Sequence, residues 1–126
     1  MIPLNCLGIG VDIISISRVK QAIEEFGEEF LKQKLTNREI NQCRNKSDYF
    51  ASISARLAAK EAFYKALGTG LSNQHSWDSI EILNGKWGNP SVHFVEDGFS
   101  VSQEQLLVSL SHETDYAIAF VVIQDR

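Results

Sequence analysis

The sequence has 126 residues, of which 44% are hydrophobic and 22% are charged, and its formal net charge is −4. This composition predicts one globular domain over residues 1–126, and no run of about 18 apolar residues is present that could cross a membrane. The acidic balance argues against nucleic-acid binding, and Cys6 and Cys43 lack the spacing of a disulfide framework or a zinc site.

The first predicted element is a buried strand in the apolar stretch CLGIGVDII, which ends near Asp12. Because Asp12 interrupts this stretch and no basic residues precede it, the stretch is not typical of a secretory signal, and we expect a cytoplasmic protein. Ser15 or Ser17 can cap a following helix that runs to about Phe26, where Gly27 breaks or bends it.

Two more helices are predicted in the first half of the chain. Thr36 and Glu39 have the spacing of a capping box and open a short helix. Ser47 can cap a long, alanine-rich helix from about Asp48 to Leu67, with Gly68 just past its end.

The C-terminal half is rich in β-branched residues. The segments SIEILNGKW and PSVHFV, with the turn signal Asn84-Gly85 between them, predict a hairpin or meander. The segment LLVSLSHETDYAIAFVVIQ predicts two alternating strands joined at about 113–115. The order of elements predicts an α+β domain, with an antiparallel sheet packed against one long helix.

The long helix carries charged residues close to its predicted buried face. At about 100° per residue, Lys60 lies inside that face and Glu61 lies about 20° beyond its edge. Arg56 and Lys65 lie further round, on opposite flanks. One interpretation is a set of ordinary surface pairs at i,i+4 spacing, such as Glu61 with Lys65, worth about 0.3–0.5 kcal/mol. The predicted buried face consists of Phe50, Ile53, Leu57, Tyr64 and Leu67.

Asp12 favours a second interpretation of these charges. A carboxylate within an apolar strand is costly unless it faces a cleft, a partner or a cation. Asp12 and Glu61 could share a hard cation such as Mg²⁺, which prefers oxygen ligands and substrate phosphates. Gly68 and Gly70 form a helix cap and turn, and they could also let the backbone approach a phosphate closely.

Three segments resemble a known family in order and spacing: GIGVDI, ARLAAKEAFYKALGTG and SLSHETDYAIAFVVI. They are similar to those of the bacterial holo-[acyl-carrier-protein] synthases, and the similarity covers nearly the whole chain. The resemblance implies the 4′-phosphopantetheinyl transferase fold. It also implies Mg²⁺-dependent transfer of 4′-phosphopantetheine from coenzyme A to a serine of apo-acyl carrier protein, with release of adenosine 3′,5′-bisphosphate.

The resemblance implies roles for individual residues. Asp12 and Glu61 match the metal carboxylates of the family, Lys65 matches a lysine at its active site, and Arg18 matches a basic residue of its carrier-docking helix. The carrier serine must lose a proton, which Glu61 or a metal-bound water could accept. The positions that match the coenzyme A side of the site are Lys60, Arg56, His112, Gly68 and Gly70.

Two alternatives stay open beside a fatty-acid carrier synthase. One is a paralogous transferase for a carrier domain of secondary metabolism, and the other is a non-catalytic coenzyme A binding module. The segment KQAIEEFGEEF keeps the paralogue open, because it is acidic where the family usually has basic residues for an acidic carrier. We favour compensation by basic residues nearby in the sequence. The candidates are Lys32, Lys34, Arg44 and Lys46.

The family resemblance further implies a homotrimer, with each active site built across a subunit boundary. The remaining functional side-chain types give weaker signals. We expect His75 and His93 to be surface residues. We expect Trp77 and Trp87 to pack against the domain rather than to stack on adenine.

Overall fold

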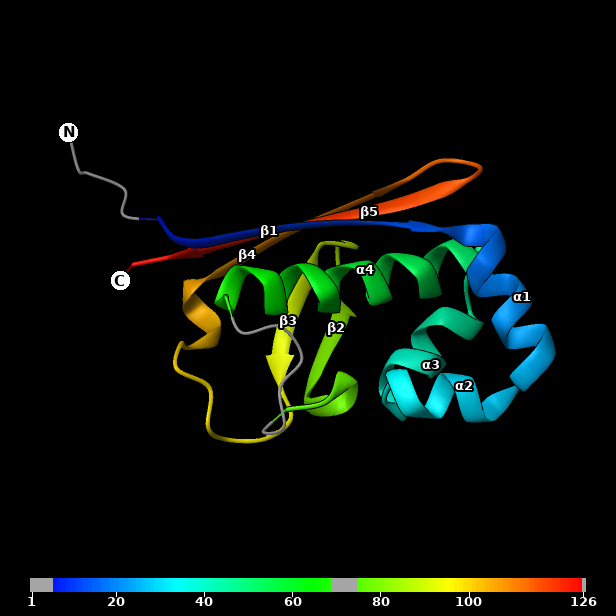
Figure 1. The fold of residues 1–126 in the computed structure, drawn as a ribbon, viewed down its shortest axis with the longest axis horizontal. Coiled ribbons are helices and arrows are strands. Elements are labelled where there is room, and N and C mark those ends of the chain that lie inside the picture. The colour runs from blue at the N-terminus through cyan, green and yellow to red at the C-terminus, as the bar shows by residue number, and fades with distance from the viewer. Residues whose placement is uncertain (1–5, 69–74, 126) are drawn as a thin grey trace.

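The computed structural model describes residues 6–68 and 75–125 and has an α+β architecture (Figure 1). The strand β1 leads into four helices, and two hairpins of strands follow. The order of strand, helices and strands is as the sequence predicts, but the short helix α2 was not predicted. Within the described residues, no helix has the length and apolar character needed to span a membrane. The elements are β1 (Cys6–Ser15), α1 (Ile16–Phe26), α2 (Glu28–Lys34), α3 (Asn37–Arg44), α4 (Tyr49–Leu67), β2 (Ile80–Asn84), β3 (Pro90–Phe94), β4 (Leu106–His112) and β5 (Tyr116–Gln124), with 3₁₀ turns η1 (Trp77–Ser79) and η2 (Gln103–Gln105).

The strands form two antiparallel sheets rather than one. The first has the order β1-β5-β4, so that β1 and β4 are its edges, and the second is the β2–β3 hairpin. Helix α4 runs along the three-stranded sheet, and Figure 1 shows α1, α2 and α3 gathered near its N-terminal end. The β2–β3 hairpin packs against α4 as well, so this helix is the central element of the fold.

The residues that begin and end the helices are largely the ones predicted. Ser15 caps α1 by accepting a hydrogen bond from the Arg18 amide, and Gly27 ends this helix with φ 64°. Thr36 and Glu39 form the predicted capping box at α3. The prediction for Ser47 is wrong, because Asp48 is the N-cap of α4 and no side chain caps it.

Helix α4 is buried nearly all round, instead of along one stripe. The first sheet covers one side of the helix, while the β2–β3 hairpin and the other helices cover much of the rest. Small alanines make this possible, because they let neighbouring backbones come close. The buried alanines of α4 are Ala55, Ala58, Ala59, Ala62 and Ala66.

The GIG segment of β1 brings the strand against the backbone of α4. A Cβ atom added to Gly8 would lie 2.1 Å from the carbonyl oxygen of Ala66, and one added to Gly10 would lie 1.9 Å from that of Ala62. No side chain can adopt these distances, so both glycines are required by packing. This contact fixes where the residues that follow Gly10 lie relative to the helix.

The expectation that β1 is a buried strand ending near Asp12 is also wrong. The strand continues to Ser15, and only its alternate residues face α4. The outward-facing residues of β1, β5 and β4 form an exposed apolar sheet face, with Val11 opposite Phe120 and Ile13 opposite Ile118. The large exposed side chains of this outer face are Leu7, Ile9, Val11, Ile13, Leu107, Tyr116, Ile118 and Phe120.

Candidate active site

Asp12 lies on the face of β1 that packs against α4, because strand residues alternate and Gly8 and Gly10 are on that face. The Lys65 ammonium donates hydrogen bonds to Asp12 Oδ1 at 2.9 Å and to the Val11 carbonyl oxygen at 3.1 Å. The Asp12 side chain is 17% exposed and that of Lys65 is 51% exposed. Lys65 therefore forms an ion pair between helix and strand, and not the surface pair with Glu61 that one of the two interpretations offered.

Glu61 lies one helical turn before Lys65 and is half-buried. It makes no hydrogen bond or ion pair with any other residue in the part of the chain that the structure describes. No cluster of three or more His, Cys, Asp or Glu side chains suited to a metal occurs among the described residues. Mg²⁺ needs no such cluster, because one or two carboxylates commonly hold it together with waters and substrate phosphates. Asp12 and Glu61 fit that requirement.

Lys60 has a structural role instead of the expected contact with coenzyme A. Its ammonium is fully buried and donates to Glu39 Oε1 at 2.7 Å, and to the carbonyl oxygens of Lys34 and Trp77 at 2.8 Å and 2.7 Å. Burial raises the pKa of Glu39 and lowers the pKa of Lys60, while their mutual attraction opposes both shifts. All three donors of the ammonium are used inside the protein, so none is left for a phosphate.

A pocket of about 160 Å³ lies beside the first half of α4 and contains Arg56 and His112. Arg56 is only 2% exposed, although the helical spacing places it on a flank. Its two terminal nitrogens donate to Ser52 Oγ at 2.7 Å and to Gln42 Oε1 at 2.8 Å, but its buried Nε has no partner. The pocket is lined by Lys46, Asp48, Ser52, Ala55, Arg56, Asn84, Gly88, Pro90, Leu110 and His112.

Lys46 is a binding candidate that the sequence did not single out for this pocket. In the sequence, Lys46 belongs to the basic segment RNK near the acidic helix, and nothing in that segment indicates that its lysine joins Arg56. The pocket combines residues of α4, of both hairpins and of the segment before α4. His112 Nε2 lies 3.0 Å from Asp48 Oδ2, which holds the imidazole at the wall. The result is a cationic pocket with a buried, unused donor, suited to an anion.

The group of Asp12, Glu61 and Lys65 and the pocket of Arg56 and His112 lie on different sides of one chain. Arg56 and Lys65 are roughly 180° apart around α4 and about 14 Å apart along its axis. In the sheet, Asp12 belongs to the edge strand β1 and His112 to the opposite edge strand β4. The structure thus separates two sets of residues that the sequence assigned to one site.

The other predicted site residues have simpler surroundings. Gly68 ends α4 in the left-handed region with φ 81°, which explains the glycine without a ligand. Gly70 lies within 69–74, outside the described residues. Arg18 is exposed on α1.

The expectations for the histidines and tryptophans are met only in part. His75 and His93 are half-buried: His75 pairs with Glu96 at 2.8 Å, and His93 lies 2.8 Å from Ser91 Oγ. Trp77 packs as expected, with the Lys34 ammonium 4.4 Å from its ring centroid. Trp87 does not pack, because it is 85% exposed.

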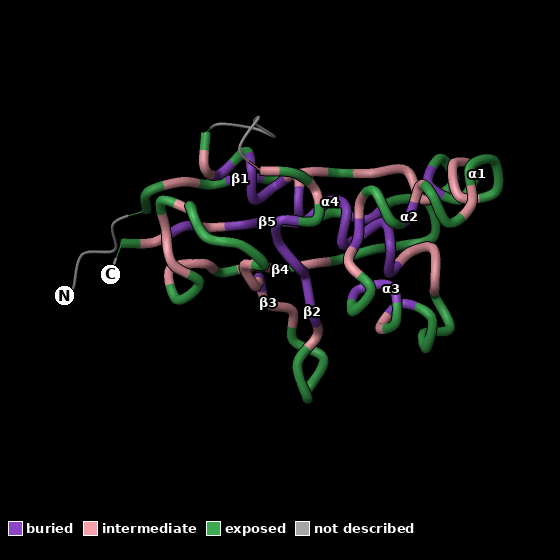
Figure 2. The backbone as a smooth tube through the Cα atoms, turned by 90° about the horizontal axis from the view of Figure 1, so that it is seen from below, coloured by how far each residue is buried: buried purple, intermediate pink, exposed green. Residues whose placement is uncertain are grey.

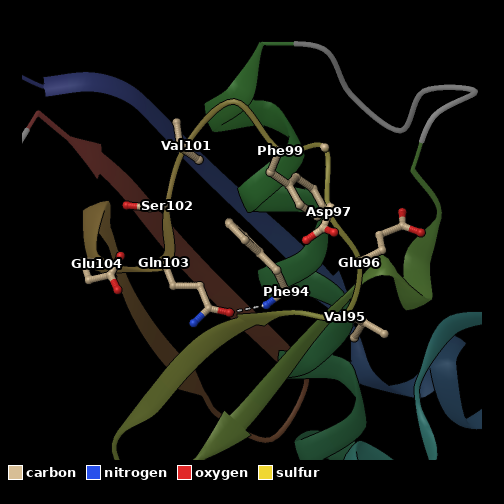
Figure 3. A pocket seen from close by; sticks show the side chains of 10 residues that line it. Phe94, Val95, Glu96, Asp97, Phe99, Val101, Ser102, Gln103 and Glu104 are labelled. Atoms are coloured by element: carbon tan, nitrogen blue, oxygen red, sulfur yellow. Dashed lines mark hydrogen bonds between the residues drawn. The ribbon is translucent and has the colours of Figure 1, made fainter.

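A further hollow of about 430 Å³ lies in the loop between β3 and η2 (Figure 3). Phe94 and Phe99 stack with ring centroids 4.3 Å apart, and Gln103 accepts a hydrogen bond from the Phe94 amide at 2.6 Å. The charged residues that line the hollow are all acidic: Glu96, Asp97 and Glu104. The negative charge of this lining would repel a ligand that carries phosphate groups.

Comparisons with known proteins agree with the fold and the motifs. Residues 8–121 match the family model of the 4′-phosphopantetheinyl transferase superfamily. A holo-[acyl-carrier-protein] synthase of Chloroherpeton thalassium is 48% identical over 116 residues, which cover 92% of this chain and 96% of that protein. The Helicobacter pylori synthase crystallised with coenzyme A is 34% identical, with a TM-score of 0.81 over 91% of this chain and 98% of its own. The Bacillus anthracis synthase, in complex with CoA (3′,5′-ADP), is 30% identical with a TM-score of 0.78, over 98% and 100% of the two chains. The chain therefore belongs to the 4′-phosphopantetheinyl transferase superfamily, with the holo-[acyl-carrier-protein] synthases as its relatives.

Proposed function

We propose that this protein transfers 4′-phosphopantetheine from coenzyme A to a serine of an apo-acyl carrier protein, in support of fatty acid biosynthesis. The reaction releases adenosine 3′,5′-bisphosphate. The observation that carries the proposal is the group formed by Asp12, Glu61 and Lys65, in a chain of this family. Phosphoryl transfer needs positioning and neutralisation of charge more than covalent catalysis, and this group offers both.

Asp12 and Glu61 would hold the Mg²⁺ ion. Both offer only oxygen donors, one from a strand and one from the helix packed against it, and this is the donor set that Mg²⁺ prefers. When bound, the ion would neutralise charge on the diphosphate of the donor. Among the described residues Glu61 has no hydrogen-bond or ion-pair partner, so it would be available to accept the proton of the carrier serine.

Lys65 would offset the negative charge that develops on the phosphoryl oxygens. Its hydrogen bonds to Asp12 and to the Val11 carbonyl oxygen hold the ammonium at the strand, yet half of the side chain stays exposed. These two hydrogen bonds use two of the three donors of the ammonium, so Lys65 could bind a phosphate without losing its contact with β1.

The nucleotide portion of coenzyme A would bind in the pocket of Arg56 and His112. The buried Nε of Arg56 has no acceptor among the residues that the structure describes, and a buried donor of this kind is costly unless a ligand satisfies it. Lys46 adds a second cation at the same pocket. These groups suit a phosphate, and the related structures with coenzyme A support the choice of ligand.

We further propose that two copies of the chain complete each active site within a homotrimer in the cytoplasm. One chain would supply Asp12, Glu61 and Lys65, and its neighbour the pocket of Arg56 and His112, because a single chain places them on different sides of α4. The exposed apolar outer face of the β1-β5-β4 sheet is the surface we expect the copies to share. Apolar patches of this kind are typical of protein contacts.

The experiment is to incubate the protein with coenzyme A, Mg²⁺ and several apo-carrier proteins and to follow the carrier mass. Modification of a fatty-acid carrier supports the proposal, while preference for a secondary-metabolism carrier supports the paralogue. If no carrier gains phosphopantetheine although coenzyme A binds, the protein is a binding module.

A matched pair of lysine variants tests the site itself. Lys65→Met should lower turnover by a factor on the order of 10² or more, the loss expected for one key electrostatic group. Lys32→Met, on the exposed surface of α2 and away from this group, is the control and should leave turnover at saturating carrier unchanged. Equal activity of both variants would exclude Lys65 from the chemistry.

A further inference from the structure

Trp87 is the most exposed large hydrophobic side chain among the described residues. It lies at the tip of the β2–β3 hairpin, which projects from the body of the molecule in Figure 2. An indole ring exposed to water does not contribute the free energy that burial of its large apolar surface would add to the stability of the fold. A tryptophan in such a place is typical of a binding residue, and its surroundings indicate the ligand.

The hairpin turn that carries Trp87 is held in one shape. The Gly85 amide donates to the Asn89 carbonyl oxygen at 2.8 Å, and the Gly88 amide donates to that of Gly85 at 3.0 Å. Gly88 has φ 84°, a conformation that side chains rarely adopt. The turn therefore presents Trp87 from a preorganised backbone, which lowers the entropy cost of binding through it.

The same turn forms one wall of the pocket of Arg56 and His112. Gly88, directly bonded to Trp87, lines this pocket, and so do Asn84 and Pro90 at the two ends of the turn. Lys86 adds a cation beside the indole, with its ammonium 5.3 Å from the ring centroid. The turn thus places an aromatic ring and a positive charge next to a cationic pocket.

The volume of the pocket limits what it can enclose. About 160 Å³ is enough for a phosphate group, but a whole nucleotide is larger. In a nucleotide the base is joined to its phosphates through the ribose, so a phosphate bound at Arg56 leaves the base outside the pocket. A planar base in this position needs an apolar surface, and the indole of Trp87 supplies one.

We propose that Trp87 stacks on the purine base of the donor nucleotide. This inference rests on the proposed binding of coenzyme A. Trp87 is then a binding residue that sets affinity for the nucleotide portion and takes no part in the chemistry. Stacking of a base on an aromatic side chain is lost on substitution by alanine, which weakens binding roughly 5- to 150-fold. The purine contributes nothing to the phosphoryl step itself, so turnover at saturating coenzyme A stays unchanged.

The test combines calorimetry and tryptophan fluorescence, with adenosine 3′,5′-bisphosphate as the probe. Trp87→Ala should raise the Kd for the probe roughly 5- to 150-fold, and Trp87→Phe, which keeps an aromatic face, should raise it less. The probe should quench fluorescence of the unsubstituted protein and of Trp77→Phe but not that of Trp87→Phe. Pantetheine 4′-phosphate, which has no base, should quench the fluorescence of none of these three proteins. Lys86→Arg, which keeps the cation beside the indole, is the control for general disturbance of the turn and should leave the Kd for the probe unchanged.

Three results would overturn the proposal. An unchanged Kd in Trp87→Ala would overturn the stacking proposal but not the proposed function, because coenzyme A would still bind without the tryptophan. So would a changed sedimentation coefficient in Trp87→Ala that fully accounts for weaker binding, since Trp87 would then be a contact between copies of the chain. Failure of the unsubstituted protein to bind the probe would overturn the proposed function as well.

Discussion

The substitution Lys60→Met separates a structural lysine from one that binds the donor. In the folded chain it leaves the Glu39 carboxylate buried with two backbone donors, the amides of Thr36 and Ile82 at 3.0 Å and 2.9 Å. It also removes the donor from the carbonyl oxygens of Lys34 and Trp77. Breaking a buried ion pair by removing one partner costs about 3–5 kcal/mol. This loss is a large part of the roughly 5–15 kcal/mol that stabilises a domain.

The pH dependence of the free energy of unfolding of Lys60→Met is a second, independent test of the structural role of Lys60. Burial raises the pKa of Glu39 above its ordinary value of 4.5, and removal of Lys60 takes away the main opposing attraction. A carboxyl whose pKa is higher in the folded state stabilises the fold below its unfolded pKa, and this contribution is lost as pH rises through the folded pKa. The deficit of Lys60→Met should therefore shrink as pH is lowered toward 4.5.

Urea unfolding followed by circular dichroism measures both effects. Lys32→Met, exposed on α2, is the control and should change the free energy of unfolding by less than about 0.5 kcal/mol. The double variant Glu39→Gln with Lys60→Met should be less destabilised than the sum of the two single variants, by about 1–3 kcal/mol, because no unpaired charge remains buried. A Lys60→Met protein of normal stability with a tenfold higher KM for coenzyme A would refute the reasoning and return Lys60 to the binding site.

Three shorter predictions concern packing, ionisation and assembly. Gly10→Ala should cost at least about 3 kcal/mol, because its Cβ would lie 1.9 Å from the Ala62 carbonyl oxygen; a melting temperature within a few degrees of the unsubstituted protein would contradict this. Burial raises the pKa of Tyr64 to about 12, so its contribution of about 2–3 kcal/mol is present below pH 10 and lost between pH 10 and 12. Tyr64→Phe should lack this loss in alkaline unfolding. Val11→Asp on the outer sheet face should dissociate the assembly in sedimentation, while exposed Gln21→Asp on α1 should not.

Local signals account for the elements that the sequence predicted well. Ser15, Gly27 and the Thr36–Glu39 capping box act within a few residues of themselves, so their spacing is visible in the chain. The single buried stripe of α4 failed because helical periodicity assumes one covered side, whereas alanines on the other sides signal further contacts. The β1 prediction failed because an apolar strand does not show whether one face or both are covered within its own chain.

The side-chain partners within the site could not be predicted in the same way. Lys65 is 53 residues from Asp12, and Lys60 is 21 residues from Glu39. Helical spacing offered each lysine a neighbour on α4. In the structure Lys65 instead pairs with Asp12 at the flank of the helix, and Lys60 pairs with Glu39 in the core. The pairing of Asp12 with Glu61 at a metal ion stays a prediction from chemistry: a carboxylate in apolar surroundings needs a partner or a cation.

The negative charge of the acidic segment 20–30, which spans the end of α1 and the start of α2, is only partly compensated by neighbouring basic residues. Glu28 forms an ion pair with Arg44 at 3.2 Å, which removes one glutamate and one candidate basic residue together. Lys34 lies against the rings of Phe30 and Trp77, and Lys46 lines the Arg56 pocket. Lys32 is the one candidate of the four left free for a carrier among these contacts. Steering of an acidic carrier would therefore depend on Arg18 and Lys32 more than on a broad basic surface.

The packing of α4 explains why its reactive groups are held so firmly. Gly10 lets β1 lie against Ala62 on one side of the helix, while Lys60, about 200° away around the axis, is fixed to the carbonyl oxygens of Lys34 and Trp77 on the other. A helix held from both sides cannot rotate, so Glu61 and Lys65 keep their places relative to Asp12. Phosphoryl transfer depends on that placement, because misplacement of charged groups by about 1 Å can cost on the order of 10² in rate. The charges of α4 are therefore not equivalent: the buried Lys60 orients the helix, and in the proposed function Glu61, next to it in the sequence, would face the reaction.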